Sequence, residues 1–113
     1  MSKKREQYVQ LLGAVVELLK ESRHWVTNTA NVSALVYHEL QQQMKTPVNW
    51  VGFYFKTTPA ADHADSSLFL GPFQGEVACV AIPNGKGVCG AAAKSKTTVV
   101  SFFPFLSSFH FHF

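Results

Sequence analysis

Apolar residues recur at helical spacing along the first part of the chain. Between residues 6 and 22 they share one face, and the set is Tyr8, Leu11, Leu12, Val15, Val16 and Leu19. A second amphipathic stretch follows Thr27-Asn28-Thr29, whose side chains can cap a helix, and its apolar stripe is Val32, Leu35, Val36, Leu40 and Met44. Pro47 rules out further helix. The pattern predicts two consecutive helices, which need a sheet or other helices to cover.

From Val48 onward, β-branched and aromatic residues dominate, and the pattern predicts four strands. The first covers 48–55, the second starts at Leu68 and stops at Gly71-Pro72, and the fourth covers 97–100. The third covers 77–82 and is apolar on both faces, so we expect it to be central and covered. A short helix over 88–94 precedes the last strand. This order of elements predicts an α+β fold with mixed α/β layers and a mainly antiparallel sheet.

Charge is distributed unevenly along the 113 residues, which suffice for one domain. No Asp or Glu follows Glu76, and Lys86, Lys94 and Lys96 supply the net charge of +3. Three scattered lysines argue against a nucleic-acid partner.

Two cysteines are too few for a disulfide scaffold, and the start lacks the apolar core of a signal peptide. We expect a cytosolic protein with free thiols and no membrane partner, with the nucleus as an alternative location.

Residues 101–113 differ from everything before them. They hold six phenylalanines and no residue charged at neutral pH, and Ser, Phe, Pro and Leu predominate. Codons for these four residues begin with two pyrimidines, so one hypothesis is that the tail translates a pyrimidine-rich non-coding stretch. The alternative is a hydrophobic peptide for docking or membrane contact, although it is too short to span a membrane. We therefore divide the chain into a domain over 1–100 and a divergent tail over 101–113.

Two cysteines ten residues apart are the strongest candidates for chemistry. Cys79 lies in the predicted third strand among small neighbours, and Cys89 lies in the first turn of the predicted helix over 88–94. Backbone N–H groups, the helix dipole and Lys86 would stabilise a Cys89 thiolate, so Cys89 has the better claim to reactivity. The alternative is that both cysteines are buried small apolar residues.

Trp50 and Tyr54 are four residues apart in a predicted strand, so they project from one face about 13 Å apart. Gly52 lies between them and has no side chain. The two aromatics would then flank a slot for a small apolar or sulfur-containing group, or they would simply pack in the core.

Two other motifs carry no function. Residues 85–90 fit G-x-G-x-x-G, but dinucleotide binding also needs a later acidic residue, and none follows. A zinc site from Cys79, Cys89, His110 and His112 has spacings unlike those of real zinc sites. We expect no metal.

Two sequence blocks resemble a known family. They are Asn49-Trp50-Val51-Gly52-Phe53-Tyr54 and the run from Leu70-Gly71-Pro72-Phe73-Gln74-Gly75 through Ala78-Cys79-Val80 to Gly85-Lys86-Gly87-Val88-Cys89-Gly90. With them, roughly residues 5–100 resemble the free methionine-(R)-sulfoxide reductases, which have the GAF fold. The resemblance implies a sheet packed by the N-terminal helices.

This resemblance also implies an activity. Members of the family reduce free L-methionine (R)-S-oxide to methionine with cysteine thiols, thioredoxin regenerates them, and no other cofactor is needed. Trp50 and Tyr54 match the aromatic residues of the substrate pocket, and Cys79 and Cys89 match two of the three redox cysteines. Which of the two attacks and which resolves stays open.

The chain departs from the family where residues 101–113 stand. In the family, the replaced segment contains the third cysteine and the carboxylates that hold the substrate amine and assist protonation. It also contains the final strands and helix of the fold. We therefore expect a partial, C-terminally truncated GAF domain with weak or absent turnover. The alternatives are a non-catalytic GAF-type module that binds a small molecule or dimerises, and a truncated isoform that does not fold stably. The resemblance leaves a homodimer open.

Overall fold

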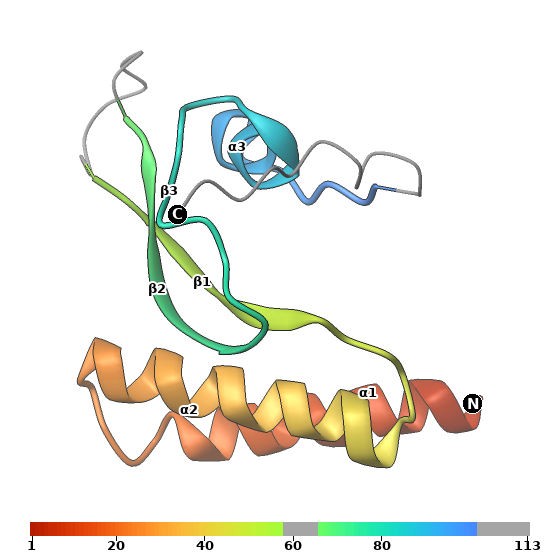
Figure 1. Cartoon of the computed structure of the whole chain (residues 1–113). Helices are drawn as coiled ribbons and strands as arrows, with labels where there is room; N and C mark the ends of the chain where they lie inside the picture. Colours follow the sequence, from red (N-terminus) through yellow and green to blue (C-terminus); the bar gives the residue numbers. More distant parts are fainter. Residues whose placement is uncertain (58–65, 102–113) are drawn as a thin grey trace. The chain divides into compact units, whose positions relative to one another are not determined.

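The computed structural model describes residues 1–57 and 66–101 (Figure 1). The chain divides into two compact units. The first unit holds residues 1–53 and 71–78, and the second holds the described residues of 54–70 and 79–113. Of the predictions made above, those on His110, His112 and nearly the whole tail lie outside the described residues.

Two helices of the first unit lie side by side in Figure 1. Helix α1 spans Lys3–Leu18, and Ser2 caps it because its hydroxyl accepts a hydrogen bond from the Arg5 N–H at 3.2 Å. Helix α2 spans Trp25–His38. Both predicted helices are therefore confirmed.

The start of α2 differs from the prediction. The helix begins at Trp25 because His24 is its N-cap, with the imidazole accepting from the Thr27 N–H at 3.5 Å. Thr29, predicted among the caps, lies inside the helix, where its hydroxyl donates to the Trp25 carbonyl at 2.7 Å. A histidine cap is not among the usual capping residues, so the sequence signal pointed downstream.

A short π-helix, η1 (Glu39–Gln43), continues directly from α2. The Gln41 side chain donates to the Val48 carbonyl at 2.9 Å and thereby fastens this turn to the chain that leads into the sheet. The helical region ends before Pro47, as predicted.

Three strands form one sheet in the order β1-β2-β3. Strand β1 spans Trp50–Lys56, β2 spans Leu68–Gly75 and β3 is the short Ala81–Ile82. Strands β2 and β3 are antiparallel, with Leu68 opposite Ile82. Helices with an antiparallel sheet confirm the predicted α+β class.

Three strand predictions are wrong. Strand β2 continues through Pro72 to Gly75 instead of stopping at Gly71-Pro72, and the buried Ser33 hydroxyl donates to the Pro72 carbonyl at 3.2 Å. Of the predicted strand over 77–82 only Ala81–Ile82 is a strand, and it lies at the end of the sheet order. Residues 97–100 form no strand.

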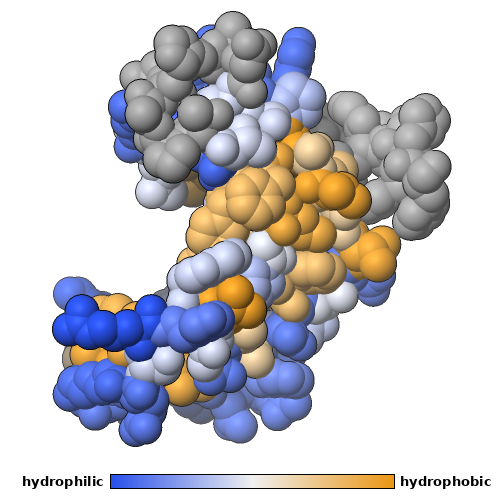
Figure 2. Space-filling model, turned by 90° about the vertical axis from the view of Figure 1, so that its left-hand side faces the viewer, coloured by the Kyte–Doolittle hydropathy of each residue, from blue (hydrophilic) through white to orange (hydrophobic). Residues whose placement is uncertain are grey.

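Exposed apolar side chains are common among the described residues, and Figure 2 shows hydrophobic groups uncovered on one face. Val77 is 59% exposed and Val80 is 79% exposed, so the segment expected to be covered is open to solvent. On α1, only Leu11 of the predicted apolar set is buried. Four members of that set are exposed by 42–64%: Tyr8, Leu12, Val16 and Leu19.

Helix α3, over Gly87–Ser95, confirms the helix predicted over 88–94 and contacts β3 within the second unit. Its buried Gly90 lies against the preceding turn, where an added Cβ would come within 3.0 Å of the Pro83 carbonyl oxygen. Gly85, in that turn, has φ +73°, a left-handed conformation that glycine adopts without strain. The turn therefore fixes the start of the helix that carries Cys89.

Candidate functional site

The second unit contains three of the four predicted site residues. Tyr54 comes from β1, Cys79 from the irregular backbone before β3, and Cys89 from the first turn of α3. Both thiols are free. Trp50, the fourth, belongs to the first unit.

A short hydrogen bond joins Tyr54 to the backbone of Cys79. The phenol donates to the Cys79 carbonyl oxygen at 2.6 Å, near the short end of the range for O–H···O bonds. Since the two residues are 25 positions apart, this bond fastens the irregular segment to the strand. Tyr54 is half-buried and Cys79 is partly exposed.

The two thiols and the phenol interact electrostatically. Partial burial raises the pKa of Cys89, and negative charge on Cys79 raises it further. Burial also raises the pKa of Tyr54, followed by the charges of Cys79 and Cys89. The fold therefore brings both sulfurs and the phenol of one unit within electrostatic reach of one another.

The expectation of a stabilised Cys89 thiolate is wrong. Cys89 does lie at the start of α3, behind Lys86 as N-cap. Its pKa is nevertheless raised, first by partial burial of the thiol and then by the charge of Cys79. Cys79 is partly exposed and Cys89 as a residue is exposed, so the alternative of two buried core cysteines is wrong as well.

The space over Gly52 is filled. A Cβ added to Gly52 would lie 2.3 Å from the Phe73 Cβ and 2.8 Å from the Trp50 indole. The indole stacks on the Phe73 ring with centroids 5.9 Å apart. An open slot at Gly52 is therefore wrong, since Trp50 and a cross-strand phenylalanine occupy it. That Trp50 borders a substrate pocket with Tyr54 stays a prediction.

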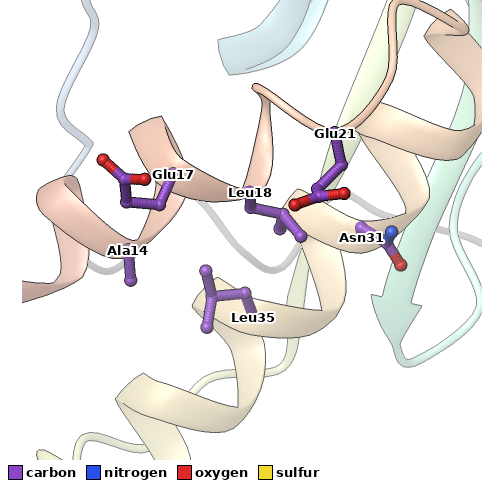
Figure 3. A pocket seen from close by; sticks show the side chains of 6 residues that line it. All are labelled: Ala14, Glu17, Leu18, Glu21, Asn31 and Leu35. Carbon is purple, nitrogen blue, oxygen red and sulfur yellow. The ribbon is translucent and has the colours of Figure 1, made fainter.

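Two depressions occur elsewhere among the described residues. One in the second unit, about 260 Å³, is lined by Lys56, Ser66, Asn84, Lys94 and Lys96. The other, about 590 Å³, is an open groove between α1 and α2 (Figure 3), lined by Ala14, Glu17, Leu18, Glu21, Asn31 and Leu35. Sequence reasoning pointed to neither. Within 1–57 and 66–101 no cluster of three or more His, Cys, Asp or Glu could hold a metal ion, and no helix is long and apolar enough to cross a membrane.

Comparison with known proteins finds relatives that include free methionine-R-sulfoxide reductases. No family model matches the chain. The free methionine-R-sulfoxide reductase of Saccharomyces cerevisiae is 42% identical over 86% of this chain and 51% of its own length. Protein YtsP of Bacillus subtilis is 45% identical over 79% of this chain and 48% of its own length. The chain thus spans about half the length of the curated relatives it matches.

Solved structures agree with these relatives. A structure described as the GAF domain superimposes with a TM-score of 0.70 at 41% identity, covering 83% of this chain and 50% of that one. The free methionine-R-sulfoxide reductase of Neisseria meningitidis, solved with its substrate, gives a TM-score of 0.66 at 35% identity over 84% of this chain and 51% of that one. These matches confirm the predicted GAF-like fold.

Proposed function

We propose that this chain, a homologue of the free methionine-R-sulfoxide reductases with a GAF-type fold, reduces free L-methionine (R)-S-oxide to methionine by thiol–disulfide chemistry. The observation that carries the proposal is that two free thiols and the Tyr54 phenol of one unit lie within electrostatic reach of one another. Two thiols are also the number that the reduction of one sulfoxide consumes. The relatives named as reductases supply the substrate class.

The reaction proceeds in two steps on this chain. A cysteine thiolate bonds to the sulfoxide sulfur while the sulfoxide oxygen takes up a proton. The hydroxyl group then passes from the substrate sulfur to the cysteine sulfur and the sulfur–sulfur bond breaks, so that methionine leaves and the cysteine is left as sulfenic acid. The second thiol then attacks the sulfenic sulfur, which releases water and leaves a disulfide. The sulfur of the substrate gains two electrons, and the two cysteines lose them.

Local chemistry assigns the two thiols different roles. The described residues of the second unit offer thiols, the phenol and lysine ammonium groups as proton donors, and no Asp or Glu is among them. The raised pKa of Cys89 favours its protonated form, so we assign to Cys89 the proton that the sulfoxide oxygen takes up. Cys79 is then the attacking thiol and Cys89 the resolving one, an assignment that the sequence left open.

Thioredoxin is the proposed reductant, and no other cofactor takes part. One thiolate of reduced thioredoxin attacks the Cys79–Cys89 disulfide, and its second thiol resolves the mixed disulfide, so both cysteines return as thiols. The proposed setting is the cytosol, where such exchange maintains free thiols.

Methionine formation from reduced protein tests this function. One equivalent of free methionine R-sulfoxide should yield methionine slowly, and the S-sulfoxide should yield none. Cys79→Ser should give no methionine. Cys89→Ser should be slower by about a hundredfold, because a proton donor is lost, and should leave a sulfenic acid on Cys79 that dimedone traps. Equal rates for Cys79→Ser and wild type would contradict the proposal.

A second proposed property is self-association through α1. Its inner face contributes the buried Leu11, whereas Tyr8, Leu12, Val16 and Leu19 are exposed at helical spacing. An amphipathic helix with a second apolar face is suited to bind a matching helix of another copy. This observation favours a homodimer.

A further inference from the structure

Side-chain packing contributes little to fixing the backbone around Cys79. Cys79 lies between β2 and β3 in irregular structure, and its neighbour Val80 is 79% exposed. Burial of apolar groups therefore contributes little to holding this segment. The position of this segment therefore depends on its hydrogen bonds.

Two hydrogen bonds hold consecutive carbonyl groups of this segment. The Tyr54 hydroxyl donates to the Cys79 carbonyl at 2.6 Å, and the Leu70 N–H donates to the Val80 carbonyl at 2.9 Å. The second is a backbone bond that any residue at position 80 would keep. The first depends on one oxygen atom of one side chain.

Cys89 is fixed separately. The Lys86 N–H donates to the Pro83 carbonyl at 3.1 Å, and the Gly90 N–H donates to the Lys86 carbonyl at 3.0 Å. Gly90 is buried against the turn. The start of α3 therefore keeps its place without help from Tyr54.

We propose that Tyr54 is a positioning residue whose hydroxyl holds the Cys79 backbone so that its thiol meets that of Cys89. The proposal deepens the proposed function and rests on it for the role of the thiol pair. It gives Tyr54 a task besides bordering a substrate pocket. Its consequence is that Tyr54 sets how readily the two thiols form a disulfide, in the absence of any sulfoxide.

Oxidised glutathione provides a substrate-free readout. A cysteine thiolate attacks glutathione disulfide and releases one glutathione, and the second cysteine displaces the other, so that two electrons pass to glutathione and one Cys79–Cys89 bond forms. The equilibrium constant of this exchange measures the effective concentration of one thiol at the other. Losing one ordinary hydrogen bond that orders a thiol should lower it about fivefold.

The experiment compares wild type, Tyr54→Phe and the control Tyr37→Phe, which removes a hydroxyl of α2 that accepts from the Gln41 side chain at 3.1 Å. Each protein is equilibrated with glutathione buffers at pH 7, alkylated, and mapped by mass spectrometry. We expect the constant to fall about fivefold in Tyr54→Phe and to stay within twofold in Tyr37→Phe. Reduced Tyr54→Phe should also react faster with iodoacetamide at Cys79, because its segment is released.

If Tyr54→Phe does not unfold cooperatively, a second comparison tests the same hydroxyl. In a Tyr8→Phe, Tyr37→Phe background, 3-fluorotyrosine at position 54 keeps the ring and makes its hydroxyl a stronger donor. The oxidation constant should then rise above that of the same background with tyrosine.

The outcomes separate this inference from the function. A constant that depends on Tyr54 in a protein that reduces no sulfoxide would support the inference and overturn the function. Sulfoxide reduction with a constant and alkylation rate unchanged in Tyr54→Phe would do the reverse. If wild type formed no Cys79–Cys89 disulfide under any buffer, both would be overturned.

Discussion

At the scale of single residues, Cys89 is the group whose surroundings matter most to the chemistry. Partial burial and the Cys79 charge both disfavour its thiolate, although the residue lies in the first turn of a helix. A thiol kept protonated at neutral pH is a proton donor before it is a nucleophile. This environment therefore decides the proposed order of the two cysteines.

The raised pKa of Cys89 predicts how stability depends on pH. Because the folded state holds this proton more tightly than the unfolded state, its contribution to stability is complete below the unfolded pKa. It is lost as the pH rises above about 8.5. Urea unfolding of the reduced protein from pH 7 to 10 should show a falling free energy of unfolding. Cys89→Ser should flatten that fall, and an equally steep fall in the variant would contradict the account.

The interaction between the thiols predicts a further shift. In Cys79→Ser the negative neighbour is gone, so the pKa of Cys89 should move down toward its ordinary value, while the effect of burial remains. The rate of iodoacetamide alkylation against pH measures it. A midpoint identical to that of wild type would show that the sulfurs do not interact.

The sequence indicated candidate reactive residues, whose roles stay a prediction, but it did not indicate their environment. Cys79, Cys89 and Tyr54 were selected from their motifs, and three of four site residues fall in one unit. The Tyr54 bond to the Cys79 carbonyl joins residues 25 apart through a backbone atom. No side-chain pattern encodes such a bond, so sequence reasoning missed it.

At the scale of elements, β1 shows why a glycine can be required without leaving a gap. The Trp50 indole and Phe73 close over Gly52, so the strand position accepts only hydrogen. Gly13 in α1 is the opposite case, because an added Cβ there would meet nothing within 4 Å. The two glycines form a matched pair.

Alanine substitutions at these glycines should act in opposite directions. Gly52→Ala overpacks the strand against Phe73 and should lower the free energy of unfolding by about 2 kcal/mol. Gly13→Ala replaces a glycine inside a helix by a better helix former without a clash, and it should raise the free energy of unfolding by about 1 kcal/mol. Urea denaturation of both variants and wild type measures the differences. A Gly52→Ala protein as stable as wild type would refute the packing described here.

Helices were predicted better than strands, and the reason is physical. Helix α3 and the bodies of α1 and α2 follow from local periodicity. Strand extent depends on partners far along the chain, so β2 passes through Pro72 and 97–100 stays unpaired despite its residues. The sequence did not predict His24 as the N-cap of α2, because histidine is not a usual N-cap residue.

At the scale of the whole molecule, uncovered apolar surface is the dominant property. The chain spans about half the length of its curated relatives, and large apolar side chains are exposed at many described positions (Figure 2). Such surface favours association. The apolar spacing predicted the α1 helix but not which of its apolar residues would be buried.

Self-association should therefore depend on α1. Leu12→Lys places a charge on its exposed apolar face, where Leu12 is 64% exposed, and should weaken a dimer at least tenfold. Gln10→Lys adds the same charge to another exposed position of the helix and serves as the control. Sedimentation equilibrium measures both. A monomeric wild-type protein at all concentrations would contradict the homodimer.

The central claim is that the fold brings the thiols of Cys79 and Cys89 together as one redox pair. Treating the reduced protein with one equivalent of hydrogen peroxide, alkylating free thiols and mapping peptides by mass spectrometry tests it most directly. The account predicts an intramolecular Cys79–Cys89 disulfide as the main product, formed at a rate independent of protein concentration. Separate sulfenic or sulfinic acids on two unlinked cysteines would contradict it.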